Sequence, residues 1–236
     1  AAIIEEITLL AAAGVKEVTL LGQNVNSYGQ KEAQISFPKL LAAVNDIAGI
    51  HRIRFATSHP KDLSSDLIYA IRDLDKVCSH LHLPVQSGSN KILKKMNRGY
   101  TREKYIDRIL KLRKECPDIA LSTDIIVGFP SETWGDFKDT MNLLREIEFD
   151  SIFAFAYSDR SSAPAARFSD QIDEDEKKER LNNLLELQEY YTGKKNKQQI
   201  GKILDVLVEG KSGKLRDGFD HVQKSMEQMV GRTQSN

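Results

Sequence analysis

The sequence predicts an α/β fold: a partial parallel βα barrel, followed by a long helix and the start of a small β-barrel. Short apolar runs alternate with amphipathic, helix-like runs over residues 1–157. The connections between the apolar runs exceed ten residues, the length that parallel strands require. After residue 157 this alternation stops, and a long charged segment follows. A doubly wound open sheet is the alternative architecture.

Each predicted strand follows a predicted helix. Thr101 is the expected N-cap of one helix, Pro117 ends it, and Tyr105, Ile109 and Leu112 share its apolar face. The strands over 124–128 and 152–155 are apolar on both faces, as expected for strands covered by helices or by a barrel interior. The expected helices are 2–13, 37–47, 64–74, 90–95, 101–116 and 133–146, and the strands lie in 17–21, 52–60, 80–89, 120–130 and 151–158.

Two domains are expected, with a boundary near residue 200. The first, 1–200, is the partial barrel with its C-terminal helix, which Gly201 would end. The second, 201–236, holds the alternating strand "KILDVLVEGKSG" and, in "VGRTQSN", what we interpret as the start of another strand. So short a segment does not make an independent β domain, which suggests a chain cut at this end.

Composition points to a soluble protein. Apolar residues make up 40% of the chain and charged residues 29%, and no run reaches the roughly 18 apolar residues of a membrane span. Without a signal-peptide pattern we expect a cytoplasmic location and no membrane contact. The 34 basic and 34 acidic residues balance, yet residues 193–236 carry nine against five. This basic end suggests a polyanion partner, with a solvated tail as the alternative.

Polar residues follow every predicted strand. In βα barrels the loops after the strand ends build the site, so these residues should converge. They include an unusual amide-rich exit, "GQNVNSYG", that a simple turn does not need. The exits contribute Gln23, Asn24, Asn26 and Ser27; Thr57, Ser58 and His59; Gln86, Ser87, Ser89 and Asn90; Thr123, Asp124, Gly128 and Glu132; and Tyr157, Ser158, Asp159 and Arg160.

The common catalytic, metal-binding and nucleotide-binding motifs fit these exit residues poorly. Ser58, His59 and Asp124 form a triad only on paper, because no GxSxG elbow occurs. His80 and His82 alternate on one strand without a third zinc ligand, and Cys78 and Cys116 lack metal-ligand spacing. Neither GxGxxG nor a P-loop is present. What remains is a cavity that grips a polar small molecule. Gly128 and Glu132 have two equally good interpretations. Gly128 could let a flat ligand approach the backbone, or the two residues could form only a tight turn with a helix cap.

Five blocks together resemble the radical S-adenosylmethionine (SAM) methylthiotransferase family. They are "LLGQNVNSYG", "RFATSHP", "LHLPVQSGSNKILKKMNRGYT", "STDIIVGFPSET" and "AFAYSDR", and the resemblance runs over 3–210 and 231–236. The "GQNVNSYG" block is most similar to the tRNA branch, which makes 2-methylthio-N6-isopentenyladenosine beside the anticodon. The ribosomal-protein branch is the second choice. The last segments resemble a TRAM domain, a small tRNA-binding β-barrel.

The resemblance implies SAM and two 4Fe-4S clusters as cofactors, and a tRNA anticodon stem-loop and a cluster reductant as partners. By motif, Gly22, Gln23 and Asn24 would hold the methionyl amino group, and Gln86 and Ser87 would face the cofactor. Thr123 and Asp124 would meet its ribose and Ile126 to Gly128 its adenine, with Glu132 closing the turn. Ser58 belongs to the same cofactor-binding set. No catalytic residue is assigned, and the RNA-binding candidates are Lys202, Lys211, Lys214 and Arg232.

The chain also departs from the family. The CxxxCxxC motif is absent, as is the domain holding the ligands of the second cluster, so no metal ligand is assigned. "RSSAPAA" after Asp159 replaces a more usual Arg-Pro-Gly-Thr, so the resemblance assigns no substrate role to Arg160. We therefore expect a central fragment that is inactive by itself. A non-catalytic binding fragment and an unrelated βα-barrel enzyme are the alternatives. A missing first strand would leave an open edge through which the fragment self-associates.

Overall fold

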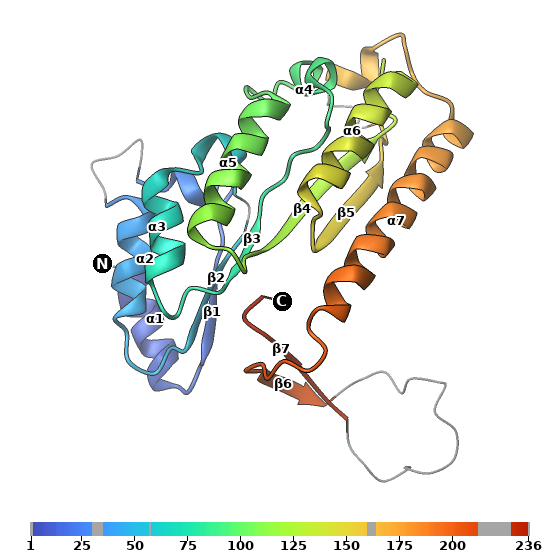
Figure 1. Ribbon diagram of the computed structural model, residues 1–236. Coiled ribbons are helices and arrows are strands. Elements are labelled where there is room, and N and C mark those ends of the chain that lie inside the picture. The colour runs from blue at the N-terminus through green and yellow to red at the C-terminus, as the bar shows by residue number, and fades with distance from the viewer. Residues whose placement is uncertain (1, 30–34, 57, 160–163, 212–227, 236) are drawn as a thin grey trace.

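The computed structural model describes residues 2–29, 35–56, 58–159, 164–211 and 228–235, and its elements follow the predicted order (Figure 1). The predicted helix and strand positions are confirmed to within a few residues. The elements are α1 (Ala2–Ala12), β1 (Glu17–Leu20), η1 (Val25–Ser27), α2 (Phe37–Asn45), β2 (Arg52–Phe55), η2 (Pro60–Asp62), α3 (Ser65–Asp73), β3 (His80–His82), α4 (Asn90–Lys95), α5 (Arg102–Glu115), β4 (Ala120–Val127), α6 (Trp134–Ile147), β5 (Ser151–Ala156), η3 (Pro164–Arg167), α7 (Glu174–Lys197), β6 (Leu207–Lys211) and β7 (Met229–Arg232).

The strands β1 to β5 are parallel and follow one another in chain order. β1 pairs with β2, and β4 lies between β3 and β5. A parallel bridge between Ile53 and Val77 joins the two groups, because the segment before β3 pairs with β2. The order never reverses, which is what distinguishes an arc of a barrel from a doubly wound sheet. The partial-barrel prediction is confirmed.

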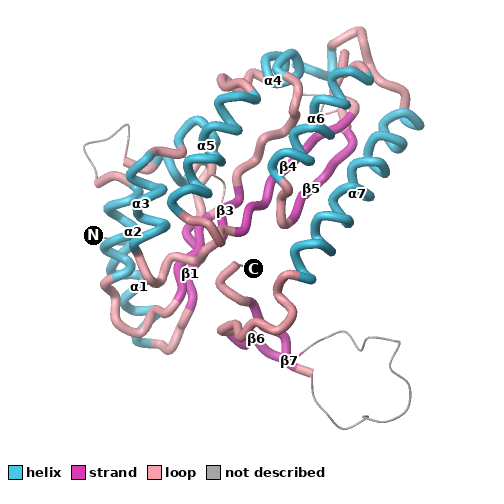
Figure 2. Tube along the Cα trace, viewed as in Figure 1, coloured by secondary structure: helices cyan, strands magenta, loops and turns pink. Residues whose placement is uncertain are grey.

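The helices form one continuous layer outside this arc (Figures 1 and 2). Each contacts the next in the order α1, α2, α3, α5, α6 and α7, and α7 also packs on β5. The core lies between strands and helices, where Leu41, Ile53, Leu81, Leu121 and Leu184 are fully buried. We call the opposite, helix-free side of the strands the inner face.

Local chemistry explains where the helices begin. Side chains of Ser64, Ser89, Thr101 and Thr133 each accept a hydrogen bond from a backbone amide of the first turn. Thr101 is the N-cap that the sequence predicts, and Tyr105, Ile109 and Leu112 are fully buried, as expected. These caps fix the helix starts, and therefore the lengths of the loops that leave the strand ends.

One prediction about β5 needs correction. Its segment 152–155 was expected to be covered on both faces, yet Phe153 and Phe155 are 55% and 54% exposed. Their register with Asp124 and Ile126 places both on the inner face. Among the described residues the arc does not close, so no strand lies opposite this part of β5.

The C-terminal strands lie at the amino-terminal end of the arc. β6 and β7 pair antiparallel, so the last residues do form a second strand. Arg52, the first residue of β2, donates hydrogen bonds to the carbonyls of Arg232 and Asp205, and Arg54 donates to that of Thr233. The division at residue 200 and the TRAM-like character of this β6–β7 hairpin stay predictions.

Candidate functional site

Two of the amide side chains after β1 tie that exit to the exit of β2. Asn26 is buried, donates through Nδ2 to the His59 carbonyl at 3.0 Å and accepts from the His59 amide at 2.9 Å. Asn24 Nδ2 donates to Asp62 Oδ2 at 2.7 Å. The amide-rich exit is therefore partly a structural clasp between neighbouring loops, a role that the sequence alone did not reveal.

Two oxygens at these exits remain without a protein partner. The Asn24 Oδ1 and Ser58 Oγ atoms are buried, and neither has a hydrogen-bond partner among the described residues. A buried polar atom without a partner costs about 1–3 kcal/mol, so such atoms often mark a place where a ligand or water binds. Gly22 and Gln23, by contrast, are exposed.

Gln86 occupies a strained position at the exit of β3. Its φ is +73°, in the left-handed region, and its side chain is largely buried. Its backbone amide donates to the backbone carbonyl of Asp124 at 2.8 Å, and its backbone carbonyl accepts from the backbone amide of Ile126 at 3.0 Å. These two bonds to β4 hold a conformation that costs a non-glycine residue about 1–3 kcal/mol, which is typical of functional sites.

A cavity of 520 Å³ opens where β3, β4 and β5 end. Three predicted cofactor residues line it: Gln86, Asp124 and Ile126. The other lining residues are Phe129, Phe155, Ala156, Tyr157, Ser158 and Ala165. Phe155 was missed because it lies inside the strand; its register with Ile126 places both on the same face. Ala165 had no sequence signal; it comes from η3, the short helix before α7.

Ser87 and Thr123 do not line this cavity, contrary to expectation. Both side chains are fully buried on the helix side of the exit. Ser87 Oγ lies 3.4 Å from Thr140 Oγ1 of α6, and Thr123 Oγ1 accepts from the Val85 amide at 2.9 Å. They fix the backbone on either side of Gln86, so any effect on a ligand passes through that residue.

Gly128 and Glu132 form the turn that the sequence predicts. The Gly128 amide donates to Glu132 Oε2 at 2.7 Å, and Gly128 has a φ of +68°. A Cβ at Gly128 would lie 2.4 Å from Lys177 Cγ of α7. The close approach that requires glycine is therefore made by a protein side chain, which favours the structural interpretation of this turn.

The Glu132 carboxylate is held inside the protein. Arg180 of α7 donates to it at 2.7 Å, and the two side chains are 0% and 1% exposed. Burial raises the pKa of Glu132, while the Gly128 amide and Arg180 act in the opposite direction. Glu132 is thus placed to join the turn to α7 and does not line the cavity.

The other proposed sites are not assembled. His59 Nδ1 accepts from the Lys61 amide at 3.2 Å, and the imidazole that faces Asp124 is that of His82, with Nε2 at 3.4 Å. No group of three His, Cys, Asp or Glu side chains suited to a metal occurs in the described part of the chain. Neither a triad with Ser58 nor a zinc site is supported.

The described residues also do not fit an iron–sulfur cluster. Such a cluster needs several thiolates, whereas the chain has two cysteines, Cys78 and Cys116, both free. Cys78 is buried, and burial raises the pKa of each thiol. Both side chains are therefore neutral thiols near pH 7; Cys78 is buried as the sequence predicts, whereas Cys116 is only partly buried.

The RNA-binding candidates that the structure describes lie away from the cavity. Arg232 pairs through Nη2 with Glu17 at 2.8 Å and with Glu209 at 2.5 Å, so its guanidinium is engaged at the start of β1. Lys202 is exposed, Lys211 lies at the end of β6, and Lys214 is outside the described residues, as is Arg160. The 520 Å³ cavity and the hairpin thus lie at opposite ends of the strands.

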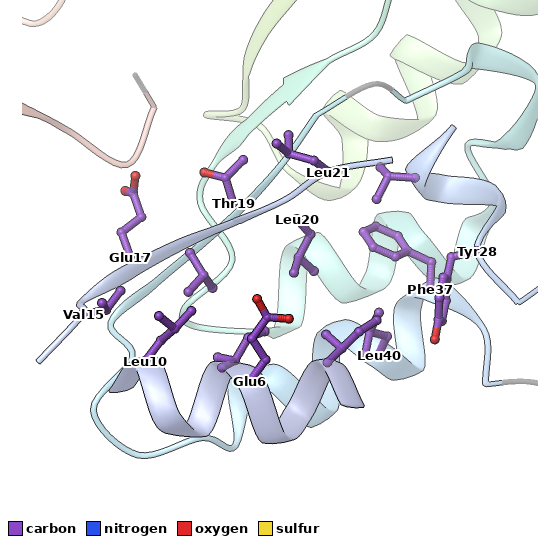
Figure 3. Close-up of a pocket in the computed structure, with 14 residues that line it drawn as sticks. Glu6, Leu10, Val15, Glu17, Thr19, Leu20, Leu21, Tyr28, Phe37 and Leu40 are labelled. Atoms are coloured by element: carbon purple, nitrogen blue, oxygen red, sulfur yellow. The ribbon is translucent and has the colours of Figure 1, made fainter. Parts of the chain in front are cut away.

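A second cavity, of 490 Å³, runs between α1 and β1 and is mostly apolar (Figure 3). Leu20 points toward α1, on the side of the strand where Glu6 lies, while Thr19 and Leu21 point to the other side. Leu21 is 73% exposed. Within the described ranges β1 pairs with β2 alone, so its other edge is open.

Among all the residues that the structure describes, no helix is long and apolar enough to cross a membrane.

The family model of the radical SAM superfamily matches residues 1–144, and the chain belongs to that superfamily. Its fold agrees with this assignment. Coproporphyrinogen III oxidase from Escherichia coli superimposes with a TM-score of 0.62 at 17% identity, covering 80% of this chain and 44% of that one. Methylornithine synthase gives 0.53 at 16% identity, covering 80% and 52%.

Within the superfamily, the resemblance to methylthiotransferases is confirmed. The tRNA-2-methylthio-N(6)-dimethylallyladenosine synthase of Desulfosudis oleivorans is 54% identical over 99% of this chain and 50% of that protein. The enzymes so named in Thermoanaerobacter pseudethanolicus and Clostridium botulinum (strain Hall) are 58% and 57% identical over 88% of this chain, and 44% and 46% of their own lengths. The chain spans about half the length of these relatives. Methylthiotransferases of this family use SAM and 4Fe-4S clusters.

Proposed function

We propose that this chain carries the SAM-binding part of a cytoplasmic tRNA methylthiotransferase. The whole enzyme would add a methylthio group to C2 of N6-isopentenyladenosine beside the anticodon, by radical SAM chemistry. The observation that carries the proposal is the cavity at the exits of β3 to β5, which brings Gln86, Asp124 and Ile126 together. The names of the relatives supply the reaction.

The cavity residues suit the parts of SAM. The Asp124 carboxylate is an acceptor for ribose hydroxyls, and Ile126 with Phe155 offers apolar contact to the flat adenine ring. Gln86 adds an amide at the strained exit of β3. Asn24 and Ser58, with their unpartnered oxygens, would take the polar methionyl end together with Gly22 and Gln23.

A titration of the chain with SAM, followed by ¹H–¹⁵N NMR, tests this assignment. We expect shifts at Gln86, Asp124 and Ile126 and an affinity about tenfold weaker after Asp124→Leu, because a hydrogen bond to a charged group contributes about 1.5–3 kcal/mol. Asp118→Leu, an exposed aspartate before β4, is the matched control. Shifts confined to the other end of the strands would contradict the proposal.

We further propose that the chain alone is inactive, because its described residues offer no cluster ligands. Anaerobic reconstitution with iron and sulfide, followed by an iron count per chain, checks this. We expect no stably bound iron. A stable cluster would show that Cys78, Cys116 or the histidines act as ligands, and our interpretation of the cysteines would be wrong.

The proposed RNA partner is the tRNA anticodon stem-loop, bound through the basic C-terminal region with Lys202, Lys211, Lys214 and Arg232. Its support is the excess of basic residues over 193–236, which suits phosphate contacts. Binding should weaken as the salt concentration rises. Lys202→Ala should reduce the slope of log binding constant against log salt concentration by about one, because one phosphate contact is lost. Salt-independent binding, or binding of a ribosomal protein in place of tRNA, would contradict this partner.

The open edge of β1 supports self-association of this chain. An unpaired parallel edge beside an apolar cavity is a ready template for another strand. Sedimentation velocity should show a concentration-dependent dimer, and Leu21→Lys should return the chain to a monomer. A monomer at all concentrations would exclude this arrangement.

A further inference from the structure

Four polar side chains form a connected row on the inner face of β3 and β4. Ser122 Oγ lies 3.0 Å from His80 Nε2 and 3.0 Å from His82 Nδ1. On its other side, His82 Nε2 lies 3.4 Å from Asp124 Oδ1. Because Asp124 lines the 520 Å³ cavity, the row runs from His80, at the start of β3, to the wall of that cavity.

The hydrogen atoms in this row can be assigned by counting donors and acceptors. An ionised carboxylate only accepts, so a proton on His82 Nε2 is favoured opposite Asp124. A neutral His82 then has a bare Nδ1, which accepts from the Ser122 hydroxyl. Since that hydroxyl carries one proton, Ser122 must accept from His80, whose Nε2 therefore carries its proton.

The surroundings agree with a neutral His80 ring. Burial, with help from the nearby charge of Arg54 and from His82, lowers the pKa of His80 to about 4. Phe153 packs edge-on against His82, with ring centroids 5.7 Å apart at 76°, and so restricts rotation of the imidazole. Three contacts, from Ser122, Asp124 and Phe153, thus fix the plane of the His82 ring.

We propose that His82 is a positioning residue: oriented by Ser122 and His80, it holds the Asp124 carboxylate by one oxygen and leaves the other for a hydroxyl-bearing ligand in the cavity. The inference rests on the proposed function, in which that ligand is SAM. Nothing in the sequence pattern alone distinguished His82 from a polar residue on a strand.

A purely structural row would also satisfy these polar groups, so the test needs a signal specific to the proton order. The ¹⁵N chemical shifts of labelled histidines at pH 7 report the tautomer of each ring. We expect His80 and His82 both to carry the proton on Nε2. We also expect Ser122→Ala to convert His82 to a mixture of tautomers. A proton on His82 Nδ1 in the unmodified chain would overturn the proposal.

The second measurement is SAM affinity by NMR titration of the same chain. His82→Phe keeps a ring against Phe153 but donates nothing, and we expect about tenfold weaker binding. His82→Gln retains an N–H near the Nε2 position and should recover affinity to within about threefold of the unmodified chain. His51→Phe, at an exposed histidine, is the matched control and should leave the affinity unchanged.

The outcomes separate the two proposals. If the unmodified chain binds SAM and His82→Phe binds it equally well, the positioning role is wrong while the cavity assignment stands. If the unmodified chain binds no SAM but both rings carry their protons on Nε2, the proposed function fails while the hold of His82 on Asp124 stands.

Discussion

Arg180 and Glu132, 48 positions apart, form an ion pair at 2.7 Å with both side chains almost completely buried. Arg180 also donates to the Glu132 carbonyl at 3.0 Å, pairs with Glu176 at 2.5 Å, and has its guanidinium 4.9 Å from the Trp134 ring centroid. The pair joins α7 to the turn after β4. The long helix is thereby locked to the strand exit beside the cavity.

Removing one partner of this pair should destabilise the fold strongly. Arg180→Met leaves the Glu132 carboxylate buried without its partner, and breaking a buried pair costs about 3–5 kcal/mol. Urea unfolding measures the loss. Lys178→Met, which removes an exposed pair with Asp175, is the control and should change stability by less than about 1 kcal/mol. Equal effects of the two substitutions would show that the Arg180–Glu132 pair does not hold α7 to the turn after β4.

Gly128→Ala should be costlier than Gly99→Ala. Both glycines have left-handed φ values, +68° and +65°, so each alanine adds about 1–2 kcal/mol of backbone strain. A Cβ meets nothing within 4 Å at Gly99, whereas at Gly128 it lies 2.4 Å from Lys177 Cγ. Thermal unfolding should therefore show a larger loss at Gly128, partly relieved by Lys177→Ala. Identical losses would mean that α7 moves to accommodate the added Cβ without any loss of stability.

The stability of the protein should fall as the pH falls from 6.5 toward 4. The folded state holds the pKa of His80 near 4, whereas an unfolded histidine titrates near 6.5. Between these values the unfolded chain binds the extra proton, so the free energy of unfolding decreases on acidification, by up to about 1.4 kcal/mol per pH unit. The lowered pKa of His59 acts in the same direction.

Urea unfolding at a series of pH values isolates the part that belongs to His80. His80→Gln should flatten the slope between pH 6.5 and 4, while His51→Gln, at an exposed position, should leave it as it is. An unchanged slope after His80→Gln would assign the effect to other groups.

Arg52 should control how firmly the β6–β7 hairpin is held. It donates to the carbonyls of Arg232 in β7 and of Asp205 just before β6, so Arg52→Met removes two hydrogen bonds between this C-terminal segment and β2. We expect faster amide exchange in Leu207–Lys211 and unchanged protection in β4. Arg72→Met, at an arginine that pairs with Asp73 and Glu115, is the control. Slow exchange in both variants would show that other contacts hold the hairpin.

The sequence determined the order and type of the elements of this protein. Alternating apolar runs and long crossovers indicated parallel strands, and Thr101 and Pro117 bounded their helix, because these are local signals of hydrogen bonding and backbone geometry. The sequence also indicated that residues of the exits after β3 and β4 lie close together, since parallel strands bring their carboxyl ends to one edge. Gln86, Asp124 and Ile126 line one cavity there, and their role in binding a cofactor stays a prediction.

Only the tertiary structure decided which way the neighbouring side chains face. Ser87 and Thr123 turn into the helix layer because Thr140 of α6 and the Val85 amide supply their partners, whereas the left-handed backbone of Gln86 leaves that residue at the cavity. The Arg180–Glu132 pair and the contacts of Arg52 join residues far apart in the chain. No local pattern encodes such partners, because burial and charge pairing depend on which elements pack together.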